Sequence, residues 1–222
     1  MIKSRNLKIS AVVPVYNNQA TVKKVVQVLL NCHFLEKVVV IDDYSQDLSL
    51  KILKSFNHKK LQLIPLPFNH GKGAAIEKAL DSIKNQIVMI VDADLSKLRK
   101  KHLINLKNSF IDSNADMVIA ARKGKLQFKL IDCLSGERIF FKKNIQSVRP
   151  LLKKVNNGFE QVVNFAHKNK KIKSIYSYNI GHILKLSRYK NKEIYKIPLN
   201  YAQEGWDLLK TTLLIKSQSR LR

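Results

Sequence analysis

The chain has 222 residues, a length that favours one α/β-sized domain, and a hydrophobic content of 45%, enough for a sizeable core. The charged fraction of 26% is ordinary for a globular protein and excludes low-complexity disorder. The balance of charge is unusual, because 41 basic and 16 acidic residues leave a net charge of +25. Such a chain attracts polyanions: nucleic acid, nucleotide phosphates or an anionic membrane surface.

The first 121 residues alternate between strand and helix patterns. Apolar, β-branched runs predict buried strands, and apolar residues at positions i, i+3, i+4 and i+7 predict helices. In chain order these patterns predict strands at 9–15, 38–41, 61–65, 87–91 and 117–121, and helices at 21–30, 48–56, 76–83 and 100–111. The alternation indicates βαβ units and an α/β fold with a mainly parallel sheet.

The rhythm is lost after residue 122. The predicted elements there are a basic loop or edge at 122–130, a strand–helix junction at 135–143, a helix at 159–167, a strand at 172–178 and an amphipathic helix at 199–215. Cys32 and Cys133 are too few and too far apart for a disulfide framework or a zinc site, which favours a reduced, cytoplasmic setting. Neither a signal peptide nor a membrane-spanning apolar run is recognisable, so we expect a soluble or peripheral protein.

Four of the predicted strands are followed by polar or glycine-containing segments. These segments are 14–18, 42–45, 69–73 and 92–94. Because ligands of open parallel sheets bind at the carboxyl ends of the strands, the four segments together predict one binding site.

Two of these segments carry carboxylates. Asp92 and Asp94, directly after a buried strand, suit a hard cation such as Mg²⁺ or Mn²⁺, which takes oxygen ligands and often keeps phosphates as further partners. The alternative is that Asp94 caps the next helix and Asp92 is solvated. Asp42 and Asp43 are able to accept hydrogen bonds from a base or ribose, or one of them forms a capping turn with Ser45.

The glycine-containing segment is the third of the four. Gly71-Lys72-Gly73 opens a predicted helix, where backbone amides, the helix dipole and the lysine favour a phosphate. The segment matches neither a P-loop nor a dinucleotide-binding fingerprint. Its other interpretation is a simple turn before a helix.

Taken in order, the four motifs resemble the family-2 nucleotide-sugar glycosyltransferases, whose fold is called GT-A, including lipid-directed and phosphoglycerate-type members. The resemblance is carried by Val13-Pro14-Val15-Tyr16-Asn17, Val40-Ile41-Asp42-Asp43-Tyr44-Ser45-Gln46-Asp47, Asn69-His70-Gly71-Lys72-Gly73-Ala74-Ala75 and Asp92-Ala93-Asp94-Leu95-Ser96. Members of this family usually have glycine where this chain has Tyr44. The resemblance covers residues 8 to about 165 well and the rest loosely.

The resemblance implies a role for each matched residue. Pro14, Tyr16 and Asn17 would line the base pocket, Asp42 or Asp43 would contact the base or ribose, Lys72 would approach the ribose or phosphates, and Asp92 and Asp94 would be the metal motif, with Asp94 the better ligand. Mg²⁺ or Mn²⁺ would bridge the diphosphate and stabilise the leaving nucleoside diphosphate.

The second half carries fainter motifs of the same family. Arg138, in Ser135-Gly136-Glu137-Arg138, would hold an acceptor phosphate, with help from Arg122. A base near an acceptor hydroxyl would be Glu160 or, second, Glu137; the plain alternative for both is a surface or ion-paired glutamate. His182 would complete the metal site, and Lys185 and Arg188 would grip a phosphate or form a solvated face.

The expected function is that of an inverting, metal-dependent glycosyltransferase. It would move a sugar from a nucleotide-sugar, UDP-linked for preference, to a phosphorylated or membrane-lipid acceptor of the cell envelope. One domain, 1–222, would contain a nucleotide-sugar half (8–121), an acceptor half (122–200) and a basic amphipathic helix (201–222). In that helix Trp206 would anchor at an anionic membrane, at the inner face of the cell membrane, unless the helix packs on the domain or forms a homodimer.

Three other readings compete with this one. A nucleotidyltransferase should carry a glycine-rich basic signature after the first strand, and the segment 14–18 has none. A nucleic-acid-binding module should show a recognised motif or interleaved aromatics, which are absent, so no specific nucleic-acid partner is expected. A non-catalytic relative remains open, because Tyr44 and the region around Glu160 depart from the family pattern.

Overall fold

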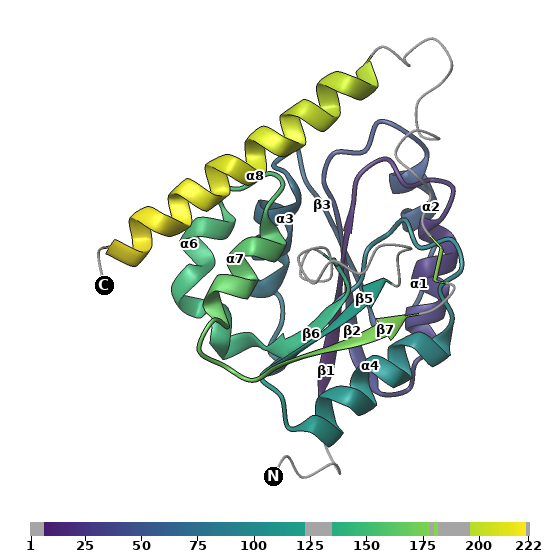
Figure 1. The fold of residues 1–222 in the computed structure, drawn as a ribbon. Helices are drawn as coiled ribbons and strands as arrows, with labels where there is room; N and C mark the ends of the chain where they lie inside the picture. The colour runs from purple at the N-terminus through teal and green to yellow at the C-terminus, as the bar shows by residue number, and fades with distance from the viewer. Residues whose placement is uncertain (1–6, 123–134, 178–179, 182–195, 221–222) are drawn as a thin grey trace.

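The structure, a computed structural model, describes residues 7–122, 135–177, 180–181 and 196–220, with the backbone alone at 122, 196–204 and 219–220. In these residues one sheet has the strand order β3-β2-β1-β4-β6-β5-β7 (Figure 1). The strands are β1 (Ile9–Val15), β2 (Leu35–Asp42), β3 (Leu61–Pro65), β4 (Ile87–Ile90), β5 (Met117–Arg122), β6 (Arg138–Phe141) and β7 (Ile172–Ser177). Among them β6 alone is antiparallel to its neighbours, so the expected α/β fold with a mainly parallel sheet is confirmed.

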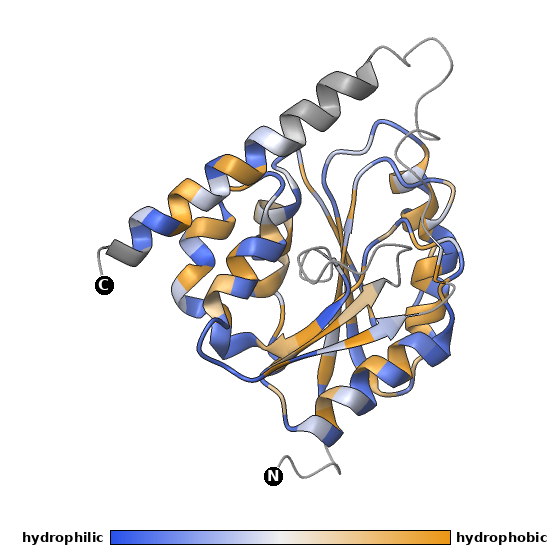
Figure 2. Ribbon diagram, in the orientation of Figure 1, coloured by the Kyte–Doolittle hydropathy of each residue, from blue (hydrophilic) through white to orange (hydrophobic). Residues whose placement is uncertain are grey.

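Helices cover both faces of the sheet (Figure 1). They are α1 (Val22–Leu30), α2 (Ser49–Lys54), α3 (Lys72–Asp81), α4 (Lys100–Ser113), the 3₁₀ helix η2 (Lys142–Val148), α6 (Arg149–Leu152), α7 (Phe159–Ala166) and α8 (Lys196–Arg220). One core lies between the sheet and α1, α2 and α4, and a second lies between the sheet and α3, η2, α6 and α7. Figure 2 shows that the strands of the sheet are largely hydrophobic, whereas the helices carry both hydrophobic and hydrophilic residues.

The strand β1 divides its residues between both cores, which explains why its sequence is apolar almost throughout. Val13 packs in the first core and Val12 in the second, as expected for a central strand whose successive side chains point to opposite faces.

The sheet opens between β1 and β4 at the carboxyl end. Their pairing ends at Val12 and Ile90, followed by one more hydrogen bond from Val91 to Val12. The backbone groups of Pro14 face the same side as those of Val12, where β4 has diverged, so the missing N–H of the proline costs no ladder bond. The chain also reverses its direction of winding here, because β2 and β4 lie on opposite sides of β1. Such a switch point is where open α/β sheets bind ligands.

Several predicted boundaries are wrong by a few residues. The helix whose apolar positions span 76–83 begins at Lys72, in agreement with the prediction that Gly71-Lys72-Gly73 opens a helix, and it ends two residues early, at Asp81. The strand predicted at 38–41 begins at Leu35, and the last helix begins at Lys196 rather than 199. The short α6 was not predicted. Of the basic segment 122–130 the structure describes only the backbone of Arg122, and the division into two halves stays a prediction.

In the part of the chain that the structure describes, no helix combines the length and the apolar character needed to cross a membrane.

Candidate active site

The loops that follow β1 and β2 are tied to each other by hydrogen bonds. The amide of Asn17 donates to Ser45 Oγ over 3.0 Å, and the amide of Gln46 donates to Asn17 Oδ1 over 2.8 Å. The amide of Asn18 donates to Ser49 Oγ over 2.8 Å. Asn17, predicted to line a base pocket, therefore uses its side chain to fix the two loops that would form that pocket.

The paired carboxylates at the end of β2 have different environments. Asp43 accepts hydrogen bonds from the amides of His70 (2.7 Å) and Gly71 (2.8 Å), one on each oxygen. Burial raises the pKa of Asp43, and the two amide hydrogen bonds offset that rise only in part. Asp42 Oδ2 accepts from the amide of Ser45 over 3.1 Å, while Asp42 Oδ1 is buried and has no hydrogen-bond partner among the residues that the structure describes. Asp43 thus fixes the loop before α3, and Asp42 keeps an oxygen available.

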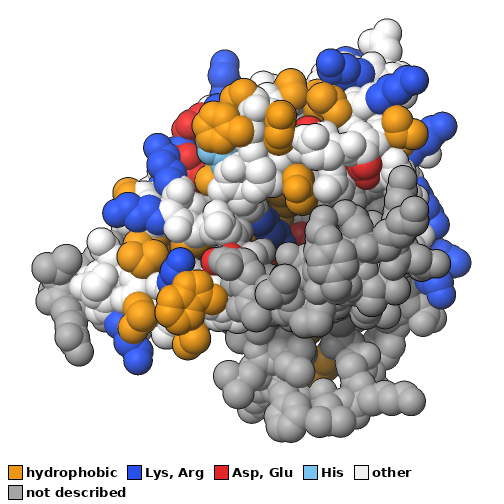
Figure 3. All heavy atoms as spheres, turned by 90° about the horizontal axis from the view of Figure 1, so that it is seen from above, with side chains coloured by type: hydrophobic (Ala, Val, Ile, Leu, Met, Phe, Trp, Pro, Cys, Tyr) orange, Lys and Arg blue, Asp and Glu red, His pale blue; other side chains and the backbone are white. Residues whose placement is uncertain are grey.

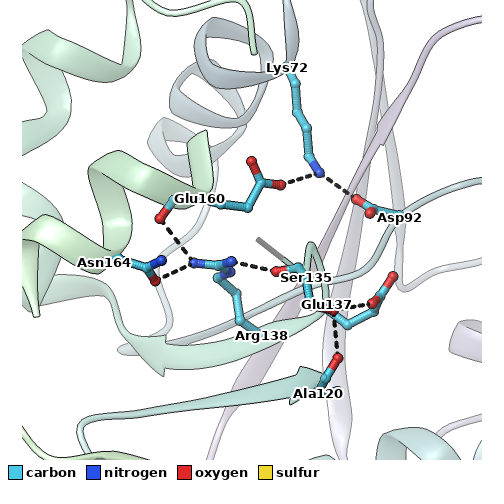
Figure 4. Close-up of polar contacts among 8 residues, drawn as sticks. All are labelled: Lys72, Asp92, Ala120, Ser135, Glu137, Arg138, Glu160 and Asn164. Carbon is cyan, nitrogen blue, oxygen red and sulfur yellow. Dashed lines mark hydrogen bonds and ion pairs between the residues drawn. The ribbon is translucent and has the colours of Figure 1, made fainter. Parts of the chain in front are cut away.

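Lys72 connects two carboxylates that are distant in sequence (Figure 4). Its Nζ lies 2.8 Å from Asp92 Oδ1 and 2.7 Å from Glu160 Oε1, and all three side chains are largely buried. Gly71, with a φ of 85°, provides the left-handed turn from which α3 begins. Burial alone would lower the pKa of Lys72, but the two carboxylates outweigh it and raise that pKa, so the lysine is charged.

The Asp92–Asp94 loop is fixed from two sides. Thr21, just before α1, donates its hydroxyl to the Ala93 carbonyl over 2.6 Å. On the other side, a Cβ added to Gly136 would lie 2.1 Å from Asp92 Oδ2, so only a glycine lets the segment before β6 pass so close. Asp92 is paired with Lys72 rather than merely solvated, and Asp94 is half-buried beside it.

The described donors suit a divalent cation in part. Among the described residues no group of three or more His, Cys, Asp and Glu side chains is placed to hold a metal ion. The predicted third ligand, His182, lies outside the described residues. Two carboxylates nevertheless fit Mg²⁺ or Mn²⁺, because these hard ions commonly take one or two protein carboxylates and complete their shell with substrate phosphates.

Arg138 and Glu160 join β6 to α7 (Figure 4). The fully buried guanidinium of Arg138 donates to Asn164 Oδ1 (3.0 Å), to the Glu160 carbonyl (3.4 Å) and to the Ser135 carbonyl. Burial opposes ionisation of Glu160, yet Lys72 and Arg138 outweigh it and hold the pKa of that carboxyl below its usual range. Glu160 is therefore an ion-paired glutamate and a weak base, and Arg138 stabilises the site from inside the fold.

The second candidate base is more deeply placed. Glu137 is buried, and its Oε2 lies 3.0 Å from Ser135 Oγ, which itself donates to the Ala120 carbonyl over 2.6 Å. The base and acceptor roles of Glu160, Glu137 and Arg138 stay predictions.

The remaining predicted residues are divided between the rim and the part not described. Pro14 is half-buried and Tyr16 is exposed at the end of β1. The side chain of Arg122, and Lys185 and Arg188 altogether, lie outside the described residues, as does His182.

Sequence reasoning missed several contributors to the site. It gave no role to Thr21, Asn164 or Gly136. In the case of Gly136, a glycine that makes room for a distant side chain leaves no periodic signal in the sequence. At the position of Tyr44 the resembling family usually has glycine. The structure explains that preference, because the φ of Tyr44 is 64°, a left-handed conformation that usually favours glycine.

Comparison with known proteins agrees with this geometry. The sequence matches Glycosyl transferase family 2 over residues 10–166. Dolichyl-phosphate beta-glucosyltransferase of Mus musculus is 30% identical over 100 residues, which cover 39% of this chain and 31% of that protein. Undecaprenyl-phosphate 4-deoxy-4-formamido-L-arabinose transferase of Edwardsiella ictaluri is 31% identical over 94 residues, 39% of this chain and 29% of that protein. The chain thus covers less than a third of the length of these two relatives.

Two solved structures share the fold. Glucosyl-3-phosphoglycerate synthase from Mycobacterium tuberculosis, solved with Mn²⁺, UDP and phosphoglyceric acid, has a TM-score of 0.71 at 16% identity, over 95% of this chain and 78% of that chain. S. aureus TarS 1-349 in complex with UDP has a TM-score of 0.62 at 22% identity, over 77% of this chain and 60% of that chain. These likenesses establish the fold, and the match over residues 10–166 establishes that the chain belongs to glycosyltransferase family 2.

Proposed function

We propose that this chain transfers a hexose from a UDP-sugar to the phosphate of a lipid phosphate, with inversion at the sugar carbon. The observation that carries the proposal is the cluster of Lys72, Asp92 and Glu160 at the switch point of the sheet, the edge at which the four motifs that resemble the family lie. The names of the two curated relatives, acting on dolichyl phosphate and undecaprenyl phosphate, support this acceptor class.

The donor would lie across the carboxyl ends of β1, β2 and β4. Asp42 Oδ1 is the buried acceptor that an N–H of the base or a ribose hydroxyl would satisfy, and the base would stack on the ring of Tyr16, which is exposed at the end of β1. Lys72, at the first turn of α3, would meet the diphosphate with its ammonium and the helix dipole.

Asp92 and Asp94 would hold Mg²⁺ or Mn²⁺, with His182 as the proposed third ligand. A bound ion there supplies positive charge that stabilises the leaving diphosphate. Lys72 holds Asp92 in place through the 2.8 Å ion pair, and Gly136 leaves room for the same carboxylate.

The protonation state of Glu160 supports a phosphate rather than a hydroxyl as the attacking group. A hydroxyl acceptor needs a base whose pKa lies near the working pH, whereas the pKa of Glu160 is lowered by Lys72 and Arg138 against the effect of burial. A phosphate oxygen is already ionised and needs no strong base. In this reading Glu160 positions Lys72, and a Glu160→Gln variant keeps measurable turnover with a lipid phosphate.

Calorimetry with UDP and GDP, each with and without Mn²⁺, tests the donor site. We expect metal-dependent binding of UDP, lost in Asp94→Ala and kept in the control Asp112→Ala, which removes an exposed carboxylate near the end of α4. Transfer from UDP-glucose to a short polyprenyl phosphate is then compared with transfer to 3-phosphoglycerate. Absence of nucleotide binding in the presence of metal would refute the transferase, and exclusive use of 3-phosphoglycerate would refute the acceptor class.

A further inference from the structure

The helix α8 carries apolar side chains on two faces. On the inner face Leu214 and Ile215 pack against the second core, beside the buried Asp207 and Thr211. On the outer face three large apolar side chains face solvent: Trp206 is 55% exposed, Leu209 59% and Leu213 65%. An amphipathic helix of a globular protein normally turns its apolar stripe to the core, so the outward stripe of Trp206, Leu209 and Leu213 calls for a partner.

Specific polar contacts hold α8 in this orientation. Asn157 Nδ2 donates to Asp207 Oδ2 over 3.0 Å. The Thr211 hydroxyl lies 2.8 Å from the Asp207 carbonyl and 3.3 Å from the Asn157 carbonyl. A Cβ on Gly158 would lie 2.4 Å from Thr211 Oγ1, so the glycine permits this close approach. The helix cannot rotate its apolar stripe inward without breaking these contacts.

The charge around the stripe is of one sign. The exposed cations Lys210 and Lys216 flank it, and Lys210 Nζ lies 5.5 Å from the centre of the Trp206 ring. In the stretch 205–218 the sequence has one acidic residue, Asp207, and it is on the buried side. An apolar helix face bordered by lysines is typical of a helix that lies at the surface of an anionic bilayer. Tryptophan suits the boundary between headgroups and acyl chains.

The stripe also lies near the candidate active site. Figure 3 looks down on the carboxyl end of the strands and shows hydrophobic side chains standing out along α8 on that face. Gly158, which touches Thr211 of α8, precedes α7 directly, and Glu160 in the first turn of α7 pairs with Lys72. A surface bound to α8 would therefore be close to the site at which a lipid phosphate reacts.

We propose that α8 docks the protein on an anionic phospholipid surface through Trp206, Leu209 and Leu213, with Lys210 and Lys216 meeting the headgroups. The benefit of this docking for catalysis rests on the proposed function, but the docking itself is measured without any turnover. A second copy of this chain seated on the same stripe is the competing occupant.

The only tryptophan of the chain, Trp206, makes the test direct. The full chain is mixed with vesicles of phosphatidylcholine that contain about 30% phosphatidylglycerol, which gives them an anionic surface. We expect a blue shift of the emission, loss of quenching by aqueous iodide and quenching by lipids brominated on the acyl chains. Pure phosphatidylcholine should give at least tenfold weaker binding, and salt should weaken binding to the anionic vesicles.

Variants separate the stripe from the overall charge. The double variant Leu209→Ser/Leu213→Ser keeps the reporter and should weaken vesicle binding at least tenfold. The matched control, Ile172→Ser/Tyr176→Ser, removes similarly exposed apolar residues from β7 and should bind as the wild type does. Lys210→Glu/Lys216→Glu should lose the preference for anionic vesicles.

Three results would overturn the proposal: no change in Trp206 emission on any vesicle, equal binding by the Leu209→Ser/Leu213→Ser variant, or a dimer in solution that this variant converts to a monomer while vesicle binding persists. UDP binding by calorimetry, measured on the same samples, reports separately on the proposed function. Loss of vesicle binding with intact UDP binding thus refutes the docking alone.

Discussion

Replacing Gly136 by alanine changes one contact and leaves the backbone as it is. Among the described residues the glycines with positive φ are Gly71, Gly158 and Gly181, so the backbone at Gly136 accepts alanine. The added Cβ would lie 2.1 Å from Asp92 Oδ2 and 2.6 Å from Asp92 Cγ. The carboxylate must retreat by roughly 1.3 Å to restore an ordinary contact of 3.4 Å.

That movement disturbs the site more than the fold. The ion pair of Asp92 with Lys72 is largely buried, but Lys72 keeps its ion pair with Glu160, so weakening the first pair should lower the free energy of unfolding by only about 1–2 kcal/mol. A displacement of about 1 Å at a reacting centre costs on the order of 100-fold in rate. We therefore expect Gly136→Ala to lose about 100-fold in kcat/KM for sugar transfer, with weaker metal-dependent UDP binding.

The assay compares transfer from UDP-glucose and thermal unfolding in the wild type, Gly136→Ala and the control Gly205→Ala. Gly205 is exposed on α8 and a Cβ there meets nothing within 4 Å, so the control should be as active as the wild type. Turnover of Gly136→Ala within threefold of the wild type would refute the reasoning, because it would mean that the position of the Asp92 carboxylate does not matter.

Three further predictions concern the same edge of the sheet. Glu160→Gln should lower the free energy of unfolding at pH 7 by about 1–3 kcal/mol, since Lys72 keeps only one carboxylate partner. Because the pKa of Glu160 is lowered in the folded state, the stabilisation from its ionised form is present above the ordinary carboxyl pKa and disappears as the pH falls through the folded pKa. The stability of the variant, measured by urea melts, should therefore fall less steeply with acid than that of the wild type. Asp43→Asn places a side-chain NH₂ group opposite one of the two backbone amides that donate to Asp43, so one of these hydrogen bonds is lost. We expect the free energy of unfolding to fall by about 1–3 kcal/mol in the same melts. An unchanged stability would contradict the role of Asp43 in fixing the loop before α3. Tyr44→Gly should raise the melting temperature or leave it unchanged, because relief of about 1–2 kcal/mol of left-handed strain exceeds or balances the backbone entropy that glycine loses on folding. A clearly lower melting temperature would show that the Tyr44 side chain stabilises the fold.

Much of the fold could be predicted from local sequence. Strands such as β1 are predictable because a central strand is apolar on both faces, and helices such as α1 are predictable because one face is apolar at helical spacing. The family could be identified from four short motifs in order, and these motifs do lie at one edge of the sheet, because parallel strands bring their carboxyl ends together.

Tertiary structure decided how these residues are used. Sequence could not tell that Asp43 holds the loop before α3 while Asp42 keeps a free oxygen, because the amides it binds are 27 and 28 residues away. It could not pair Lys72 with Glu160, which are 88 residues apart, and so could not see that the candidate base is held ionised.

The last helix separates the two kinds of information most clearly. Its sequence determined that Trp206, Leu209 and Leu213 share one face with lysines beside it, since spacing alone fixes which residues share a face of a helix. Only the fold decided that this stripe points outward, because the contacts of Asp207 with Asn157 and of Thr211 with Gly158 set the rotation of α8. Periodicity gives the faces of an element, and long-range contacts choose which of them is buried.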